Sequence, residues 1–198
     1  MKSQSSVSLF ILVAVFIILS AGIAGCVSQT PSAPPVTQQK LSTIEPSQMG
    51  LEPPDVPADF TLVEKYERNA SDLSDWALEH GWKKGYGTYY TSNGQDVRGM
   101  DQVISVYPVE NISLVIPSTL QNMKDWSAEE NMSIEVLPAP SVGDSSSALR
   151  MSEAGDPIDL YMIAFVKYDV YEELWINGTA PEYDTLKQVA HTAAAKIQ

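Results

Sequence analysis

Apolar and polar residues alternate along several short stretches after residue 58, and this twofold period predicts β-strands. The run at 158–166 is almost continuously apolar, which is typical of a central strand that is buried on both faces. Asn93-Gly94 marks the connection between two tyrosine- and valine-rich stretches, although this connection is longer than a two-residue hairpin. The predicted strands cover residues 60–66, 84–91, 102–109, 133–137, 147–151, 158–166 and 170–176.

Two shorter stretches have the longer period of helices. Ser71 can cap a helix that places Leu73, Trp76, Ala77 and His80 on one stripe, and Gly81 is suited to end it. Proline restricts the residue before it to extended geometry, so we expect the next helix to begin at Pro117. Leu120 and Met123 would then point inward.

The C-terminal helix is the most strongly patterned element. Thr179 and Glu182 have the spacing of a capping box, which predicts that the helix begins there. Strands and helices in this order predict an α+β domain, an antiparallel sheet covered by helices that include this last one. Its inward stripe is Leu186, Val189, Ala190, Ala193 and Ile197.

The first 25 residues have the composition of a signal peptide. Lys2 precedes an unbroken apolar run from Leu9 to Leu19, which is shorter than the roughly 20 apolar residues of a membrane span. Residues 26–57 are rich in Pro, Ser, Thr and Gln and predict a disordered tether. Residues 58–198 remain as one globular domain of ordinary size.

Ile23-Ala24-Gly25-Cys26 resembles the lipobox of exported lipoproteins, whose cysteine receives a diacylglyceryl group and becomes the mature N-terminus. The resemblance implies a lipidated Cys26 on the outer face of the cytoplasmic membrane, and two acyl chains are a sufficient anchor. Cys26 is the only cysteine, so the domain has no disulfide. The alternative is an uncleaved membrane helix over residues 7–27, which would leave the domain on the same outer side.

Four Asn-x-Ser/Thr acceptor sites exceed the single site that chance predicts for this composition, and they make N-glycosylation a candidate modification. Together with the lipobox and the acidity, they resemble the features of archaeal surface proteins. The acceptor residues are Asn69, Asn111, Asn131 and Asn177.

Acidic charge excludes two classes of partner. The part beyond Cys26 has 25 Asp and Glu against 11 Lys and Arg, a net charge of −14. Such a surface repels nucleic acid and anionic lipid headgroups, so we expect neither as a partner of the domain. A solvated surface explains the acidity without an acidic binding site.

In element order the domain is also similar to PsbP-like and Mog1-like α+β domains.

Catalytic signatures are scarce in the sequence. His80 and His191 are the only histidines, and structural roles fit both better than catalysis. No nucleophile elbow, phosphate loop, dinucleotide fingerprint or zinc motif is present, and no cofactor is expected. Paired carboxylates remain possible at Asp156, Asp159, Glu172 and Glu173, and calcium at Asp144, Glu153 and Asp156, although the spacing of a calcium loop is absent.

An aromatic cluster occurs between residues 82 and 90, at Trp82, Tyr86, Tyr89 and Tyr90. On one sheet face it would form a stacking platform for sugars or peptides. Adjacent strand residues point to opposite faces, so Tyr89 and Tyr90 cannot share a platform, and core packing is the favoured role.

These observations favour a non-enzymatic lipoprotein that acts as a binding or accessory module, with an envelope protein or a glycan as partner. A carboxylate-based extracytoplasmic hydrolase is the alternative, and a deep pocket with two carboxylates would favour it. A small-ligand carrier is the third hypothesis, although the domain is short for a two-lobed receptor.

Overall fold

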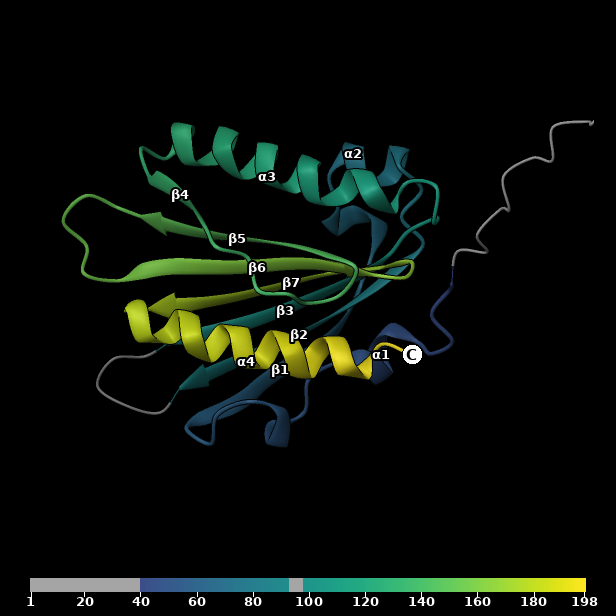
Figure 1. Cartoon of the computed structure of the whole chain (residues 1–198), viewed down its shortest axis with the longest axis horizontal. Helices are drawn as coiled ribbons and strands as arrows, with labels where there is room; N and C mark the ends of the chain where they lie inside the picture. Colours follow the sequence, from purple (N-terminus) through teal and green to yellow (C-terminus); the bar gives the residue numbers. More distant parts are fainter. Residues whose placement is uncertain (1–39, 93–97) are drawn as a thin grey trace, which may run out of the picture. The chain divides into compact units, whose positions relative to one another are not determined.

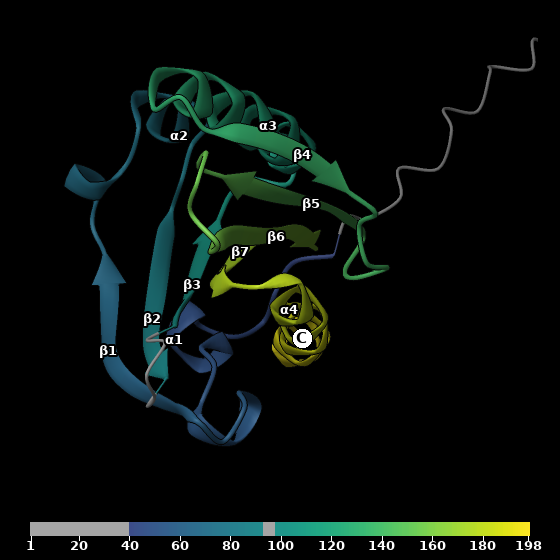
Figure 2. The ribbon, with the colours of Figure 1, turned by 90° about the vertical axis from the view of Figure 1, so that its left-hand side faces the viewer.

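A seven-stranded antiparallel sheet forms the centre of the domain, and helices cover both of its faces (Figures 1 and 2). The computed structural model describes residues 40–92 and 98–198, so Cys26, the leader and Asn93-Gly94 lie outside the described residues. The architecture confirms the predicted α+β class, with an antiparallel sheet, covering helices and a C-terminal helix. Within the described ranges, no helix has the length and apolar character to span a membrane.

All seven predicted strands are present, with ends that lie within three residues of the predicted ones. The strands are β1 (Phe60–Arg68), β2 (Lys84–Ser92), β3 (Gly99–Val106), β4 (Ser133–Leu137), β5 (Ser145–Ser152), β6 (Asp159–Lys167) and β7 (Val170–Gly178). The helices are α1 (Pro46–Met49), α2 (Asp75–Glu79), α3 (Ile112–Glu129) and α4 (Ala180–Lys196), with short 3₁₀ turns η1 (Pro53–Asp55) and η2 (Ala70–Asp72).

The strand order is β1-β2-β3-β7-β6-β5-β4. Helix α3 crosses one face of the sheet from the end of β3 to β4 at the far edge, and β4 to β7 then return until β7 pairs with β3 (Figure 1). Strand β6, predicted to be central, lies between β7 and β5 and is buried along nearly its whole length. The sheet therefore joins two meanders through a single pairing.

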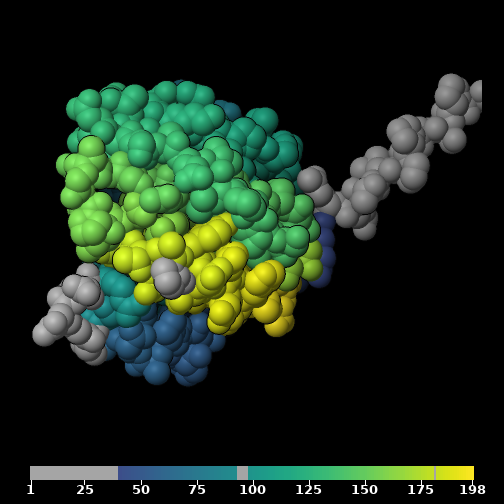
Figure 3. All heavy atoms as spheres, turned by 60° about the vertical axis from the view of Figure 1, so that its left-hand side comes forward, coloured from purple at the N-terminus to yellow at the C-terminus, as the bar shows by residue number. Residues whose placement is uncertain are grey.

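Helix α4 covers the face opposite α3, over β6 and β7 (Figure 2). The five predicted inward residues are at most 3% exposed, which confirms the predicted stripe. Thr179 precedes the helix as predicted, but its side chain makes no capping hydrogen bond. In Figure 3 the yellow α4 fills the surface between the green segments above it and the blue N-terminal strands below.

Residues 40–57 belong to the domain, which corrects the predicted boundary of the tether at residue 57. Met49 and Leu51 are completely buried in the core on the α4 face. Pro46 and Pro53 begin α1 and η1, because the fixed φ angle of proline suits the first turn of a helix. Proline in this segment marks short helical turns that are packed on the sheet.

Helix α3 begins five residues before the predicted start, so the prediction of a helix start at Pro117 is wrong. Ile112, Val115 and Ile116 are buried against the sheet and stabilise the first turns. Pro117 lies inside the helix and leaves the carbonyl of Ser113 without its usual partner. Both residues are exposed, so water can reach that carbonyl.

Helix α2 also begins later than predicted, because Ser74 rather than Ser71 is its N-cap. The Ser74 Oγ accepts a hydrogen bond from the Ala77 N–H at 3.4 Å, whereas Ser71 lies in η2. Gly81 follows the helix with a φ of 77°, as expected for a terminating glycine.

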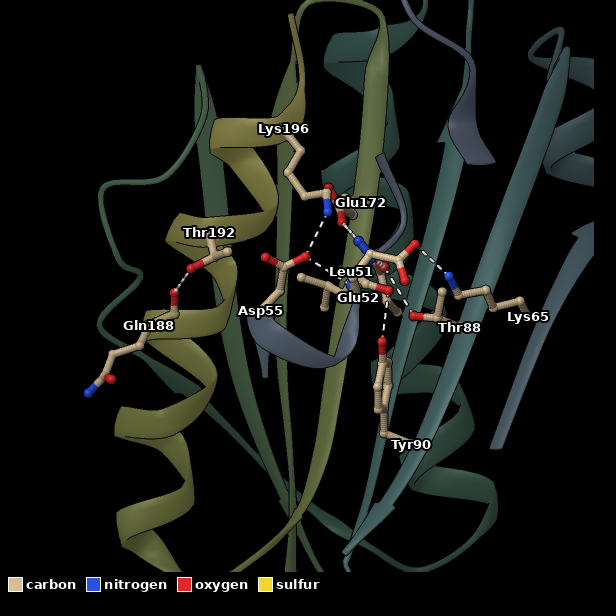
Figure 4. A network of polar contacts seen from close by, with 11 residues as sticks. Leu51, Glu52, Asp55, Lys65, Thr88, Tyr90, Glu172, Gln188, Thr192 and Lys196 are labelled. Atoms are coloured by element: carbon tan, nitrogen blue, oxygen red, sulfur yellow. Dashed lines mark hydrogen bonds and ion pairs between the residues drawn. The ribbon is translucent and has the colours of Figure 1, made fainter. Parts of the chain in front are cut away.

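A buried polar network fastens residue 51 to the sheet (Figure 4). The Gln102 Oε1 accepts the Leu51 N–H at 2.7 Å and the Thr88 hydroxyl at 3.1 Å, while its Nε2 donates to Glu172. The Tyr90 hydroxyl donates to the Leu51 carbonyl at 2.7 Å. Buried polar groups that are paired in this way hold one arrangement of the chain, so the segment before β1 is fixed in place.

Glu172 is the one acid of this network and is completely buried. Burial raises the pKa of Glu172 to about 8, against the opposing effects of the Gln102 hydrogen bond and of the nearby Lys196. The folded protein therefore retains a proton that the unfolded chain loses above pH 4.5, and stability falls as the pH rises from about 4.5 to about 8.

We predict that Glu172→Gln removes this loss of stability. The free energy of unfolding of the variant relative to wild type should increase from pH 5 to pH 8, because the amide has no proton to lose. Urea unfolding midpoints at pH 5, 6.5 and 8 measure this difference, with the exposed Glu67→Gln as control. A difference that stays constant over this range would contradict the assignment.

Candidate functional site

A cleft of about 570 Å³ opens between α3 and the sheet. Helix α3 packs on β4 to β7 and covers the sheet only in part, so Tyr89 of β2 and Asp101 of β3 on the same face are partly exposed. Apolar and aromatic walls with few polar groups are typical of ligand pockets. The lining residues are Tyr89, Gly99, Asp101, Met123, Trp126, Leu160, Trp175, Ile176 and Asn177.

Strand register places an acid between two aromatic residues on the floor of the cleft. Tyr89 of β2 lies opposite Asp101 of β3, and Asp101 lies opposite Trp175 of β7. Directly opposed residues have Cβ atoms about 4.5–5.5 Å apart, so the three side chains form one row across three strands. Trp126 and Met123 of α3 line the cleft on the helix side.

Asp101 is the polar centre of this row. Its Oδ1 is buried and has no hydrogen-bond partner, and Asp101 forms no ion pair with any residue that the structure describes. Burial raises the pKa of Asp101 to about 6, the charge of Glu173 adds to this rise, and Arg68 opposes it. The Gln102 backbone N–H hydrogen bonds to the carboxylate and also opposes this rise. A half-buried carboxylate with one oxygen that meets no donor is costly to the fold and is a common mark of a functional site.

Glu173 lies beside this row but is already hydrogen-bonded. Its Oε1 accepts the Tyr171 hydroxyl at 2.6 Å and its Oε2 accepts the Trp175 Nε1–H at 3.1 Å. The Tyr171 hydroxyl lies 2.7 Å from the Thr119 hydroxyl of α3. Glu173 therefore fixes the orientation of the Trp175 ring and connects it to the helix.

A smaller cavity of about 120 Å³ adjoins the cleft at Met123 and extends along the same face. Arg68 and Glu173 both line it, and the Arg68 Nη1 donates to the Ser105 Oγ at 2.9 Å. Burial raises the pKa of Tyr107, another lining residue, to about 12, so its hydroxyl stays protonated.

The predicted aromatic cluster separates between the two faces, as the alternation of strand residues requires. Tyr89 is 37% exposed and lines the cleft, whereas Tyr90 is buried in the core on the α4 face. Tyr86 packs against the same core as Tyr90, and Trp82 packs on the α3 side. Core packing is therefore confirmed for most of the cluster, and only Tyr89 contributes to the cleft.

The acids that the sequence singled out do not form one site. Asp159 binds Arg150 at 2.8 Å and Ser152 at 2.6 Å, which is a structural role. Glu172 faces the α4 core and Glu173 the smaller cavity beside the cleft, because they are consecutive strand residues. Asp156 accepts the Ile158 N–H at 2.8 Å in an exposed turn. The proposed carboxylate pairs among these four residues are therefore not brought together.

The candidate calcium ligands are also separated. Asp144 precedes β5, whereas Glu153 and Asp156 follow it, so an eight-residue strand about 26 Å long lies between them. Asp144 instead accepts the Tyr168 N–H at 2.8 Å. Among the described residues, no three His, Cys, Asp or Glu side chains are grouped so that they could hold a metal.

Both histidines lie away from the cleft lining. His80 is the C-cap of α2, and its ring stacks on Trp76 with the centroids 4.0 Å apart, which confirms a structural role. His191 is exposed on α4, on the opposite side of the sheet.

The four glycosylation acceptors differ in accessibility. Asn69 and Asn131 are exposed, at the end of β1 and just after α3. Asn111 is half-buried, and its Nδ2 donates to the His80 carbonyl at 2.9 Å. Asn177 is half-buried, lines the cleft and accepts the Gly99 N–H. Cys26, the predicted lipidation residue, lies outside the described residues.

Comparisons with known proteins identify the fold but no family. No protein-family model matches the chain, and no curated protein matches it. The structure is similar to the extracellular domain of PknH from Mycobacterium tuberculosis, with a TM-score of 0.57 and 11% sequence identity. The match covers 76% of this chain and 93% of that domain. At this identity, the likeness shows the fold alone.

We predict that glycans in the native host are attached to Asn69 and Asn131, and not to Asn111 or Asn177. The attachment atom of Asn111 is already hydrogen-bonded, and a sugar on Asn177 would enter the cleft. Intact mass of the four single Asn→Gln variants tests this prediction. The first two variants should each lose one glycan mass, and the other two should match wild type. Loss of mass from Asn177→Gln would show that the cleft carries a sugar.

Proposed function

We propose that this protein is a lipid-anchored extracytoplasmic binding module, held on the outer face of the cytoplasmic membrane, whose cleft receives a ligand. The observation that carries the proposal is the cleft itself, an aromatic pocket with a half-buried carboxylate whose Oδ1 has no hydrogen-bond partner among the described residues. The lipobox at Ile23–Cys26 supports the anchor, and the resemblance of the fold to an extracellular domain supports the location. The ligand can be presented by an envelope protein or a glycan, or be free.

A second candidate function is hydrolysis by carboxylates, and Asp101 favours it because its pKa of about 6 suits a general acid. The second carboxylate would have to be Glu173, whose two oxygens already accept hydrogen bonds from Tyr171 and Trp175. This engagement favours binding over catalysis. Aryl glycosides separate the two functions, because turnover that disappears in Asp101→Asn would establish a hydrolase.

The anchor is tested by Cys26→Ser. We expect wild-type protein from native membranes to begin at a lipid-modified Cys26, and the variant to be unprocessed or released from the membrane. Intact mass with peptide mapping measures both, and Ser28→Ala is the matched control. Retention of residues 1–25 without lipid in the wild type would instead show a single-span membrane protein with the same outward domain.

The cleft is tested with indole as a neutral aromatic probe on the full chain in detergent. We expect indole to shift the methyl resonance of Met123, which lines the cleft, and not that of Met49 in the opposite core. Trp126→Ala should weaken indole binding at least threefold, because one aromatic wall is lost. Trp126 is 39% exposed, so the free energy of unfolding should change by less than about 1 kcal/mol.

Leu114→Ala is the matched control, because Leu114 is also an exposed apolar residue of α3 but does not line the cleft. It should leave indole binding unchanged. If indole shifts no cleft resonance, or if the two variants behave alike, the cleft is not a ligand site.

A further inference from the structure

The residues on the floor of the cleft select the charge of its ligand, and this inference rests on the proposed binding function. On the floor of the cleft, Asp101 lies between Tyr89 and Trp175, in directly paired positions of three strands. Trp126 adds a third aromatic residue from the opposite wall. An acid surrounded by aromatic faces is complementary to a positive charge with apolar substituents.

The negative charge at this position has no positive partner within the described part of the chain. The Oδ1 of Asp101 is buried and makes no hydrogen bond. Arg68 is the described cation that acts on Asp101, but its Nη1 donates to Ser105 and it forms no ion pair with Asp101. A cation bound in the cleft would balance the charge of the carboxylate.

Glu173 increases the selectivity for positive charge. It lies two residues from Trp175 on β7, on the same face of the sheet, and adds a second carboxylate whose field reaches Asp101. An anionic ligand in the cleft would be repelled by Asp101, which lines it, and by Glu173 in the adjoining cavity. A cation would interact favourably with both and would also face the electron-rich rings.

We infer that the cleft binds the alkylated ammonium group of an organic cation, with Asp101 as its counter-charge and with Tyr89, Trp126 and Trp175 as aromatic walls. The aromatic rings contact the alkyl groups, and Asp101 balances the charge without requiring a hydrogen-bond donor. The remainder of the ligand would extend along the cleft of about 570 Å³.

The test compares choline with 3,3-dimethyl-1-butanol, a neutral carbon isostere of the same shape. Each is titrated into the full chain in detergent, with the Met123 methyl resonance as readout and Met49 as the internal control. Choline should bind at least tenfold more tightly than the alcohol, because only choline carries the charge that Asp101 and the rings recognise.

Asp101→Asn should weaken choline binding at least tenfold and leave indole binding within about twofold. Asp184→Asn, which removes an exposed acid from α4 on the opposite face, is the matched control for net charge and should not change choline binding. The thermal unfolding midpoint of Asp101→Asn should be at least that of wild type, since a half-buried charge without an ion-pair partner among the described residues is removed, and this shows that the variant is folded.

Equal binding of choline and the alcohol would overturn the inference, as would an unchanged choline affinity in Asp101→Asn. In both cases indole binding would still support the cleft as a ligand site. If neither choline nor indole shifts the Met123 resonance, the proposed binding function fails together with the inference.

Discussion

Strand β3 pairs with β7 over seven residue pairs, from Met100–Ile176 to Val106–Val170, and these partners are far apart in the sequence. This pairing joins the meander of β1 to β3 to the meander of β4 to β7. Neither meander has a complete core alone, because residues of β2, β3, β6 and β7 contribute to the same cluster under α4. Loss of this register would therefore disrupt both the core and the cleft.

The same pairing closes the core on one face of the sheet and forms the floor of the cleft on the other. On the α4 face it places Gln102 beside Glu172, where the network with Leu51 closes the core. On the α3 face it places Asp101 opposite Trp175, where the helix covers the sheet only in part. The cleft exists because α3 spans from β4 to β7 and no second long helix in the described part of the chain covers β2 and β3 on that side.

Local patterns were sufficient to predict the elements, because strand alternation and the α4 stripe depend on neighbours a few residues apart. These patterns were not sufficient where contacts between distant parts of the sequence determine the structure. Buried Ile112, Val115 and Ile116 extend α3 past Pro117, and buried Leu51 fastens a proline-rich segment to the sheet. Both features depend on contacts with strands that are distant in the sequence.

The candidate site was predictable only in fragments. Tyr89 belonged to a visible aromatic cluster, and alternation correctly separated it from Tyr90. Asp101 and Trp175 carried no local signal, since neither belongs to a motif and their proximity is set by a register between residues 74 positions apart. The sequence has 25 acids, and the strand pairing rather than any local pattern identifies Asp101 as an acid that lies opposite both Tyr89 and Trp175.

Among the described acids, Glu172 and Asp101 have strongly raised pKa values, but they lie in different surroundings. Both lie in the β3–β7 region, and burial is the main cause for each. Glu172 accepts a hydrogen bond from Gln102 and thereby fixes the network that orders the segment before β1. Each carboxylate has one buried oxygen that meets no donor among the described residues, but Asp101 lines the cleft whereas Glu172 is enclosed in the core. A half-buried charge without an ion-pair partner reduces stability unless another molecule balances it, and Asp101 lines an open cleft in which such a molecule can bind.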